Sequence, residues 1–103
     1  MSDPIKAITR RIARRCDGLV TSLLQRQSSP WRSVVFDGER HRFQLSIEGE
    51  TIEEALLAIQ DEIATDLPIP GHLLSEISVH RIDRAPMAAF VTLDATTIRL
   101  EKA

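Results

Sequence analysis

The sequence predicts an α+β fold, a two-layer sandwich in which two helices cover one face of an antiparallel sheet. Three observations predict it: two stretches with apolar residues at helical spacing, four stretches of alternating apolar and polar residues, and short turn sequences between paired strands. The expected element order is α-β-β-α-β-β, and two hairpins that each follow a helix place both helices on one face. Residues 1–103 are expected to form a single α+β domain, because the chain has the usual length of one.

The first helix is predicted to begin at Pro4, because Asp3 can cap the free amides and a proline there loses no hydrogen bond. An apolar stripe at helical spacing follows and keeps its phase past Gly18. One helix is therefore expected to run to about Gln27 and to end at residues 28–30. The stripe consists of Ile5, Ile8, Ile12, Cys16, Leu19, Val20, Leu23 and Leu24.

A hairpin is predicted next. Residues 31–36 are β-prone, and the Asp-Gly dipeptide at 37–38 is typical of two-residue hairpin turns. A turn there pairs Val34 with His41, which would place Val34 and Phe36 on the apolar face of the sheet. The inward positions of the return strand are His41, Phe43, Leu45 and Ile47.

The second helix is predicted to follow Thr51, which forms a capping box with Glu54. Its apolar stripe is expected to pack on the core, and residues 67–71, with two prolines, are expected to end it in an extended connection. The stripe consists of Ile52, Ala55, Leu56, Ile59 and Ile63. The acidic residues expected on its outer side are Glu53, Glu54, Asp61, Glu62 and Asp66.

A second hairpin is expected from residue 73 onward, with a turn at 83–86. In its first strand Leu73, Ile77 and Val79 are predicted to point inward. The alternation of the last strand changes phase near residues 94–95, which a bulge or an additional strand would explain.

Composition and cysteine content indicate the class of protein. The fractions of hydrophobic (43%) and charged residues (27%) are typical of a soluble globular domain. No apolar stretch approaches the roughly 20 residues that cross a bilayer, and no signal peptide is recognisable. The single cysteine excludes an internal disulfide, so a cytoplasmic protein without membrane contact is expected.

Charge is distributed unevenly along the chain. Residues 1–32 hold seven bases and two acids, whereas the remaining residues hold six bases and thirteen acids. Four of the bases share the helix face opposite the apolar stripe and could neutralise phosphates. The pI of 5.9 argues against a nucleic-acid-binding domain, which usually has a pI above 9, and a solvated outer face explains the pattern equally. The candidate phosphate-binding residues are Lys6, Arg10, Arg11 and Arg14.

Neither a metal site, nor a cofactor site, nor a catalytic centre is predicted. His41, His72 and His80 lack the spacing and the cysteine partners of a zinc site. Cys16 lies on the apolar stripe, so a buried and inert thiol is expected. A small enzyme with a pocket around His72 and the loop at 68–71 is the weakest of the alternatives.

Self-association is predicted instead, because helices on one face leave the other face of the sheet bare. The residues expected on or near that face are Ile82, Ala88 and Phe90. The sequence therefore favours a non-catalytic protein-interaction or assembly domain, acting as a homodimer, whose partner is itself or another protein. The alternative is a nucleic-acid-associated accessory protein that binds phosphates through the first helix.

Overall fold

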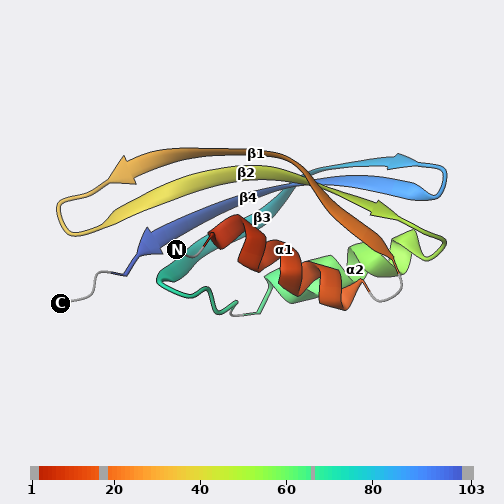
Figure 1. Cartoon of the computed structure of the whole chain (residues 1–103), viewed down its shortest axis with the longest axis horizontal. Coiled ribbons are helices and arrows are strands. Elements are labelled where there is room, and N and C mark those ends of the chain that lie inside the picture. The colour runs from red at the N-terminus through yellow and green to blue at the C-terminus, as the bar shows by residue number, and fades with distance from the viewer. Residues whose placement is uncertain (1–2, 17–18, 66, 101–103) are drawn as a thin grey trace.

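The computed structural model describes residues 3–16, 19–65 and 67–100. Two helices pack against each other on one face of a four-stranded antiparallel sheet with the order β1-β2-β4-β3 (Figure 1). The elements are α1 (Pro4–Arg15), β1 (Val20–Arg32), β2 (Asp37–Glu48), α2 (Ile52–Ile63), β3 (His72–Ala85) and β4 (Ala88–Arg99). The predicted two-layer sandwich and its element order are confirmed. Within the described ranges, no helix is long and apolar enough to span a membrane.

The strands are much longer than the helices that cover them. A twelve-residue helix spans about 18 Å, whereas a strand of that length spans about 40 Å. The domain is accordingly elongated, with extents of 47 × 22 × 20 Å. The β1–β2 hairpin projects beyond the helices at one end, and the β3–β4 hairpin turns at the opposite end (Figure 1). The sheet therefore has a covered centre and an uncovered end.

The core lies between the helices and the covered centre of the sheet. The inward positions predicted for the return strand of the first hairpin are all buried, as is the middle of the α2 stripe. The fully buried side chains include Ile5, Ile8, Ile12, Phe43, Leu45, Ile47, Ile59, Val91 and Leu93. These side chains bring both helices and the two central strands into one cluster.

The first helix is shorter than predicted, since α1 ends at Arg15 and residues 20–32 form β1. Asp3 caps the start of α1 as expected, with its Oδ1 accepting from the Ile5 amide at 3.1 Å. β1 pairs with β2 along its whole length, and this ladder outweighs the helical spacing. Leu19 and Leu23 pack on the core although the helix does not reach them. Residues four positions apart lie on one side of a strand as well as on one side of a helix.

The turn of the first hairpin precedes the predicted dipeptide. Arg32 pairs with Asp37, so Ser33 to Phe36 form the turn. The Ser33 amide donates to the Phe36 carbonyl at 2.9 Å, and the Ser33 Oγ accepts from the Phe36 amide at 3.0 Å. Because the turn lies there, Val34 and Phe36 are exposed, and their predicted place in the core was wrong.

α2 begins after Thr51 as predicted, although the Thr51 side chain makes no capping hydrogen bond. The connection that follows α2 packs inward through two apolar side chains, Leu67 and Ile69. Asp66, expected on the acidic outer side of this helix, lies outside the described residues.

The second hairpin turns at Pro86 and Met87, and Met87 has a φ of 62°. The turn predicted at 83–86 was too early, because β3 continues to Ala85, which pairs with Ala88. A proline followed by a residue with positive φ is typical of a type II turn.

β4 keeps one register with β2 from Ala88 to Ile98, so the bulge or additional strand predicted near residues 94–95 is absent from this part of the structure. Its inward side simply continues through Ala95 and Thr97, which are small or polar. The apolar Ile98 lies on the outer side. Because the inward residues at this end of β4 are small or polar and an outward residue is apolar, the sequence pattern looks like a change of phase.

β3 is irregular instead, because its register with β4 shifts twice. The first shift brings Leu74 against the core and leaves Leu73, predicted to point inward, more than half exposed. The second shift pairs Ile82 with the buried Val91. Ile82 therefore packs on the core, and its predicted position on the outer face was wrong.

Candidate functional site

Apolar side chains gather at the uncovered end of the sheet, around the turn of the β1–β2 hairpin. Val34 is 104% exposed and Val35 is 80% exposed, so neither packs on its own chain. We call this surface the end patch. Its six side chains line one open hollow and are Val34, Val35, Phe36, Leu73, Ile98 and Leu100. Isolated apolar residues are common on protein surfaces, whereas a contiguous patch marks an interaction site.

A row of cross-strand neighbours on the outer face of the sheet adjoins the end patch and shares Ile98 and Leu73 with it. Trp31 pairs with Gly38, and Gly38 pairs in turn with Ile98. Leu73 completes the row on β3, where the first register shift has turned it outward. The Trp31 indole lies across Gly38, since a Cβ at that glycine would come within 2.7 Å of the indole Nε1. Four strands thus contribute to one surface.

The turn presents its apolar side chains in a fixed geometry. The Ser33 hydroxyl accepts hydrogen bonds from the amides of Val35 and Phe36, and the Arg32 and Asp37 side chains approach to 3.5 Å across the base of the turn. These bonds satisfy backbone groups that a loop would otherwise leave to water. The apolar residues are therefore displayed by an ordered turn.

Charges of both signs border the end patch. Arg99 and Asp37 line the hollow, and Asp37 pairs with Arg32. Arg40 and Glu76 are exposed on the neighbouring outer face, and neither makes an ion pair with any described residue. The rim of the patch thus carries no strong excess of one sign.

Sequence reasoning missed the end patch. The signal was present as the run Val34-Val35-Phe36 between Ser33 and an Asp-Gly dipeptide, but two turn positions were compatible with it. The choice between a core position and an exposed tip depends on how far β1 pairs with β2, which local spacing does not reveal.

The residues predicted for self-association do not form one surface. Ala88 and Phe90 lie on the outer face and are half-buried, whereas Ile82 points inward. The outer face around them is largely polar. The Arg42 Nε donates to Asp94 Oδ1 at 2.7 Å, and this bond lowers the pKa of the Asp94 carboxyl. Self-association through Ala88 and Phe90 stays a prediction.

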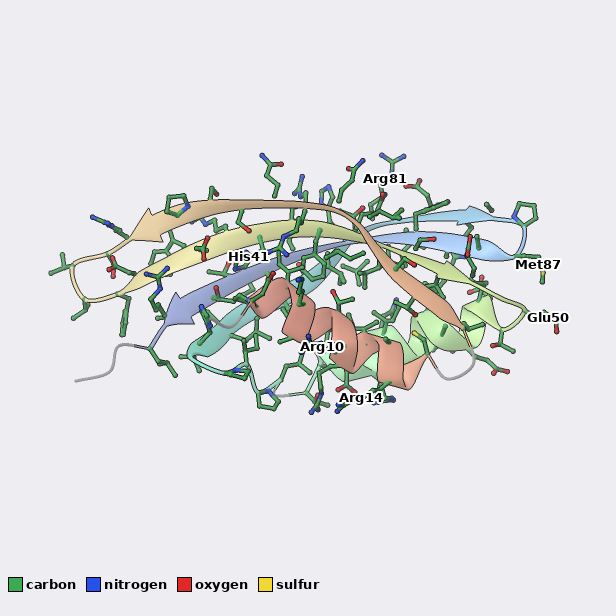
Figure 2. The ribbon with its side chains drawn as sticks, viewed as in Figure 1. Arg10, Arg14, His41, Glu50, Arg81 and Met87 are labelled. Carbon is green, nitrogen blue, oxygen red and sulfur yellow. The ribbon has the colours of Figure 1, made fainter. Side chains whose placement is uncertain are left out.

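The basic face of α1 is only partly free. Lys6, Arg10 and Arg14 are exposed and make no ion pair with any residue that the structure describes. Figure 2 shows Arg10 and Arg14 along α1. Arg11, predicted to join them, is directed to Glu62 on α2 instead. Three of the four candidate phosphate-binding side chains thus remain available to a partner.

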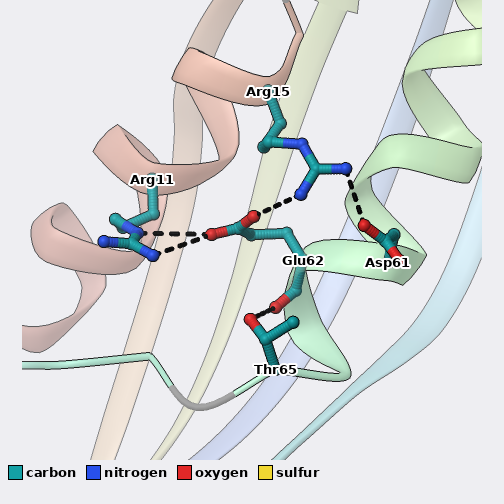
Figure 3. A network of polar contacts seen from close by, with 5 residues as sticks. All are labelled: Arg11, Arg15, Asp61, Glu62 and Thr65. Carbon is teal, nitrogen blue, oxygen red and sulfur yellow. Dashed lines mark hydrogen bonds and ion pairs between the residues drawn. The ribbon is translucent and has the colours of Figure 1, made fainter.

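Glu62 joins the two helices (Figure 3). Its carboxylate accepts from Arg15 Nη1 at 2.7 Å and from Arg11 Nε at 3.2 Å, and Arg15 also donates to Asp61 at 2.7 Å. Glu62 is only 6% exposed, so its predicted place on the acidic outer side of α2 was wrong. A carboxylate that is buried needs such partners, and the network has a structural role.

His41 is buried with both ring nitrogens in hydrogen bonds. The Nδ1 lies 2.7 Å from Ser28 Oγ, and the Nε2 lies 2.9 Å from Thr97 Oγ1. Burial lowers the pKa of His41, which favours the neutral ring with one donor and one acceptor nitrogen. The ring is covered by β1 and lies on the inward side of the sheet, as predicted for His41. A buried imidazole requires hydrogen-bond partners for its nitrogens, so these contacts give His41 a structural role.

His72 lies in an open groove between the end of α2 and the edge strand β3, as the small-enzyme alternative expected. Residues 63–65, 67–70 and 72–77 line the groove, and most of them are apolar. The His72 Nδ1 lies 3.1 Å from the Pro70 carbonyl oxygen. Catalysis requires several converging polar groups, and the ionisable side chains that line this groove are His72 and Glu76.

The remaining chemical candidates are structural in character. Cys16 is buried as predicted, and burial raises the pKa of its thiol, which keeps the thiol protonated and unreactive. Among the residues that the structure describes, no group of three His, Cys, Asp or Glu side chains could hold a metal ion.

Comparison with known proteins identifies the fold and no family. No protein-family model matches the sequence, and no curated protein matches it. A chain from the virion of a native gene transfer agent particle is similar in structure, with a TM-score of 0.56 and 19% identity over 84% of this chain and 71% of that chain. A crystal structure from Akkermansia muciniphila has a TM-score of 0.40 and 12% identity, over 95% of this chain and 50% of that chain. The first likeness supports the α+β fold described above.

Proposed function

We propose that this domain is a non-catalytic module of a protein assembly and that it binds its partner through the end patch. The observation that carries the proposal is a group of apolar side chains around one hollow, formed by the turn of the projecting β1–β2 hairpin and the adjoining ends of β3 and β4. The structurally similar chain belongs to a virion particle, which supports an assembly role.

The end patch suits binding on energetic grounds. Burying a valine, leucine or phenylalanine side chain that was exposed contributes about 1.5–3 kcal/mol. The Ser33 hydrogen bonds already order the turn, so little conformational freedom is lost when Val35 and its neighbours meet a partner. A projecting tip also reaches a partner without a clash between the helical layers.

A photo-crosslinking amino acid at position 35 tests the proposal in the cells that normally make the protein. The control carries the same group at Leu57, which is 68% exposed on the outer side of α2 and distant in sequence from the patch. We expect one discrete protein adduct from position 35 and none from position 57. Equal labelling at the two positions, or no adduct at position 35, would contradict an interface at the end patch.

Phosphate binding by α1 is a second candidate function, favoured by the exposure of Lys6, Arg10 and Arg14. On B-DNA, the logarithm of affinity would fall with the logarithm of salt concentration by about 0.9 per phosphate neutralised. Replacing Arg10 and Arg14 by glutamine would flatten that slope by about two, whereas replacing Arg40 and Arg99 would not. Duplex binding weaker than about 1 μM at physiological salt, without these differences, would remove this candidate.

A further inference from the structure

We infer that the partner of the end patch is a second copy of this chain, paired end to end about a two-fold axis. The inference rests on the proposed function and specifies its partner. Three properties of the patch support it: the shape of the surface, the signs of the charges around it, and its continuity with the neighbouring groove.

The shape of the end patch is self-complementary. Val34 and Val35 protrude at the turn, and the hollow beside them has Leu73, Ile98 and Leu100 in its wall. A two-fold axis presents the same surface of both copies to each other, so the tip of each copy meets the hollow of the other. One patch that holds both a projection and a hollow needs no second surface.

The charges around the patch also suit a second copy. Arg99 lines the hollow, and Glu76 lines the adjoining groove. Neither makes an ion pair with a described residue, and a two-fold arrangement allows each to meet the opposite charge of the other copy. A strongly acidic or strongly basic partner would find no such balance at this rim.

The apolar surface continues past the hollow, which increases the area available for contact. Leu73 belongs both to the end patch and to the groove along β3, where Leu74 and Ile77 also lie. A stable interface buries about 800 Å² on each partner, and interfaces of that size range from micromolar to picomolar affinity. With a small tip at its centre, this pairing is expected at the micromolar end of that range.

Sedimentation of the full chain between about 1 and 200 μM measures the pairing. We expect the mean mass to rise toward twice the chain mass with concentration. Val35→Glu should weaken the dimer by at least about tenfold, because it places a carboxylate at the centre of the contact. Leu57→Glu is the matched control, and it should leave the dimer intact.

The geometry of the dimer is tested with nitroxide labels on single cysteines at Arg32, next to the end patch, and at Met87, at the opposite end (Figure 2). The buried Cys16 should not take up the label. End-to-end pairing predicts a short distance between the two labels at position 32. It also predicts a separation between the labels at position 87 that exceeds the 47 Å length of one copy.

The other outcomes of these experiments would contradict either the geometry of the dimer, the second copy as partner, or the proposed function. A short distance between labels at position 87 would move the dimer to another surface, such as the one around Phe90. A monomer at every concentration, combined with a position-35 adduct of another mass in cells, would overturn the second copy and leave the proposed function in place. A monomer without any adduct would overturn both.

Discussion

The covered centre and the uncovered end of the sheet differ in where their apolar residues lie. Beneath the helices, the inward positions of β2 are apolar from Phe43 to Ile47 and fully buried. Toward the β1–β2 turn they become polar, beginning with His41, while apolar side chains gather at the turn and on the outer face. In the centre, apolar residues are buried and hold the fold together, and at the end they are exposed.

This difference explains why apolar residues in a strand are buried in one region of the sheet and exposed in another. An apolar residue in a strand packs inward only where something covers that side of the sheet. The two helices of twelve residues cover only part of strands that have similar residue counts. The length of the covering layer, rather than the apolar pattern alone, therefore decides where the core ends.

Alanine substitutions should produce the largest difference in unfolding free energy between the covered centre and the uncovered end. Leu56→Ala and Ile59→Ala should each lower the free energy of unfolding by about 2–5 kcal/mol, because they leave cavities under the sheet. Val34→Ala and Val35→Ala should change it by less than about 0.5 kcal/mol, since both side chains are exposed. Urea denaturation of the four variants measures these values at a low protein concentration. Comparable losses at the tip and in the centre would show that the tip is packed.

The part of the fold that sequence predicted correctly is the covered part. The α2 stripe and the inward positions of β2 follow spacings that burial enforces, so reading them required no knowledge of long-range pairing. Ile77 and Val79 in β3, also predicted to point inward, pack on the core as well. The first turn, the extent of α1 and the sides of Leu73 and Ile82 depended on strand register and bulges. Leu73 shows the consequence, because one register shift moves it from a predicted core position to the end patch.

Gly38 should show that the uncovered end still has structural constraints of its own. A Cβ at this position would meet the Trp31 indole and the Thr97 carbonyl oxygen, so Gly38→Ala should lower the free energy of unfolding by about 1–3 kcal/mol. Arg40→Ala, two residues away on the same face, should change it by less than about 0.5 kcal/mol. Equal effects from the two variants would mean that the Trp31 packing over Gly38 is not part of the folded state.

His41, at the boundary between the two regions, should make stability depend on pH. Burial lowers its pKa below 6.5, with charges on Glu39 and Asp3 opposing and those on Arg26 and His72 adding to the shift. The unfolded chain then binds a proton before the folded chain does, so stability is complete above pH 6.5 and falls as pH drops below it. Urea denaturation from pH 7.5 to 5 should show a smaller decline for His41→Gln than for the parent. A decline unchanged by His41→Gln would contradict the assignment.

We propose that the apolar tip serves binding and does not stabilise the fold. The most direct test measures two properties of the double variant Val34→Glu/Val35→Glu, the free energy of unfolding at low concentration and the mass in solution at high concentration. We expect an unfolding free energy within about 0.5 kcal/mol of the parent and a monomer at concentrations where the parent pairs. A variant that loses several kcal/mol of stability, or one that still pairs, would contradict this proposal.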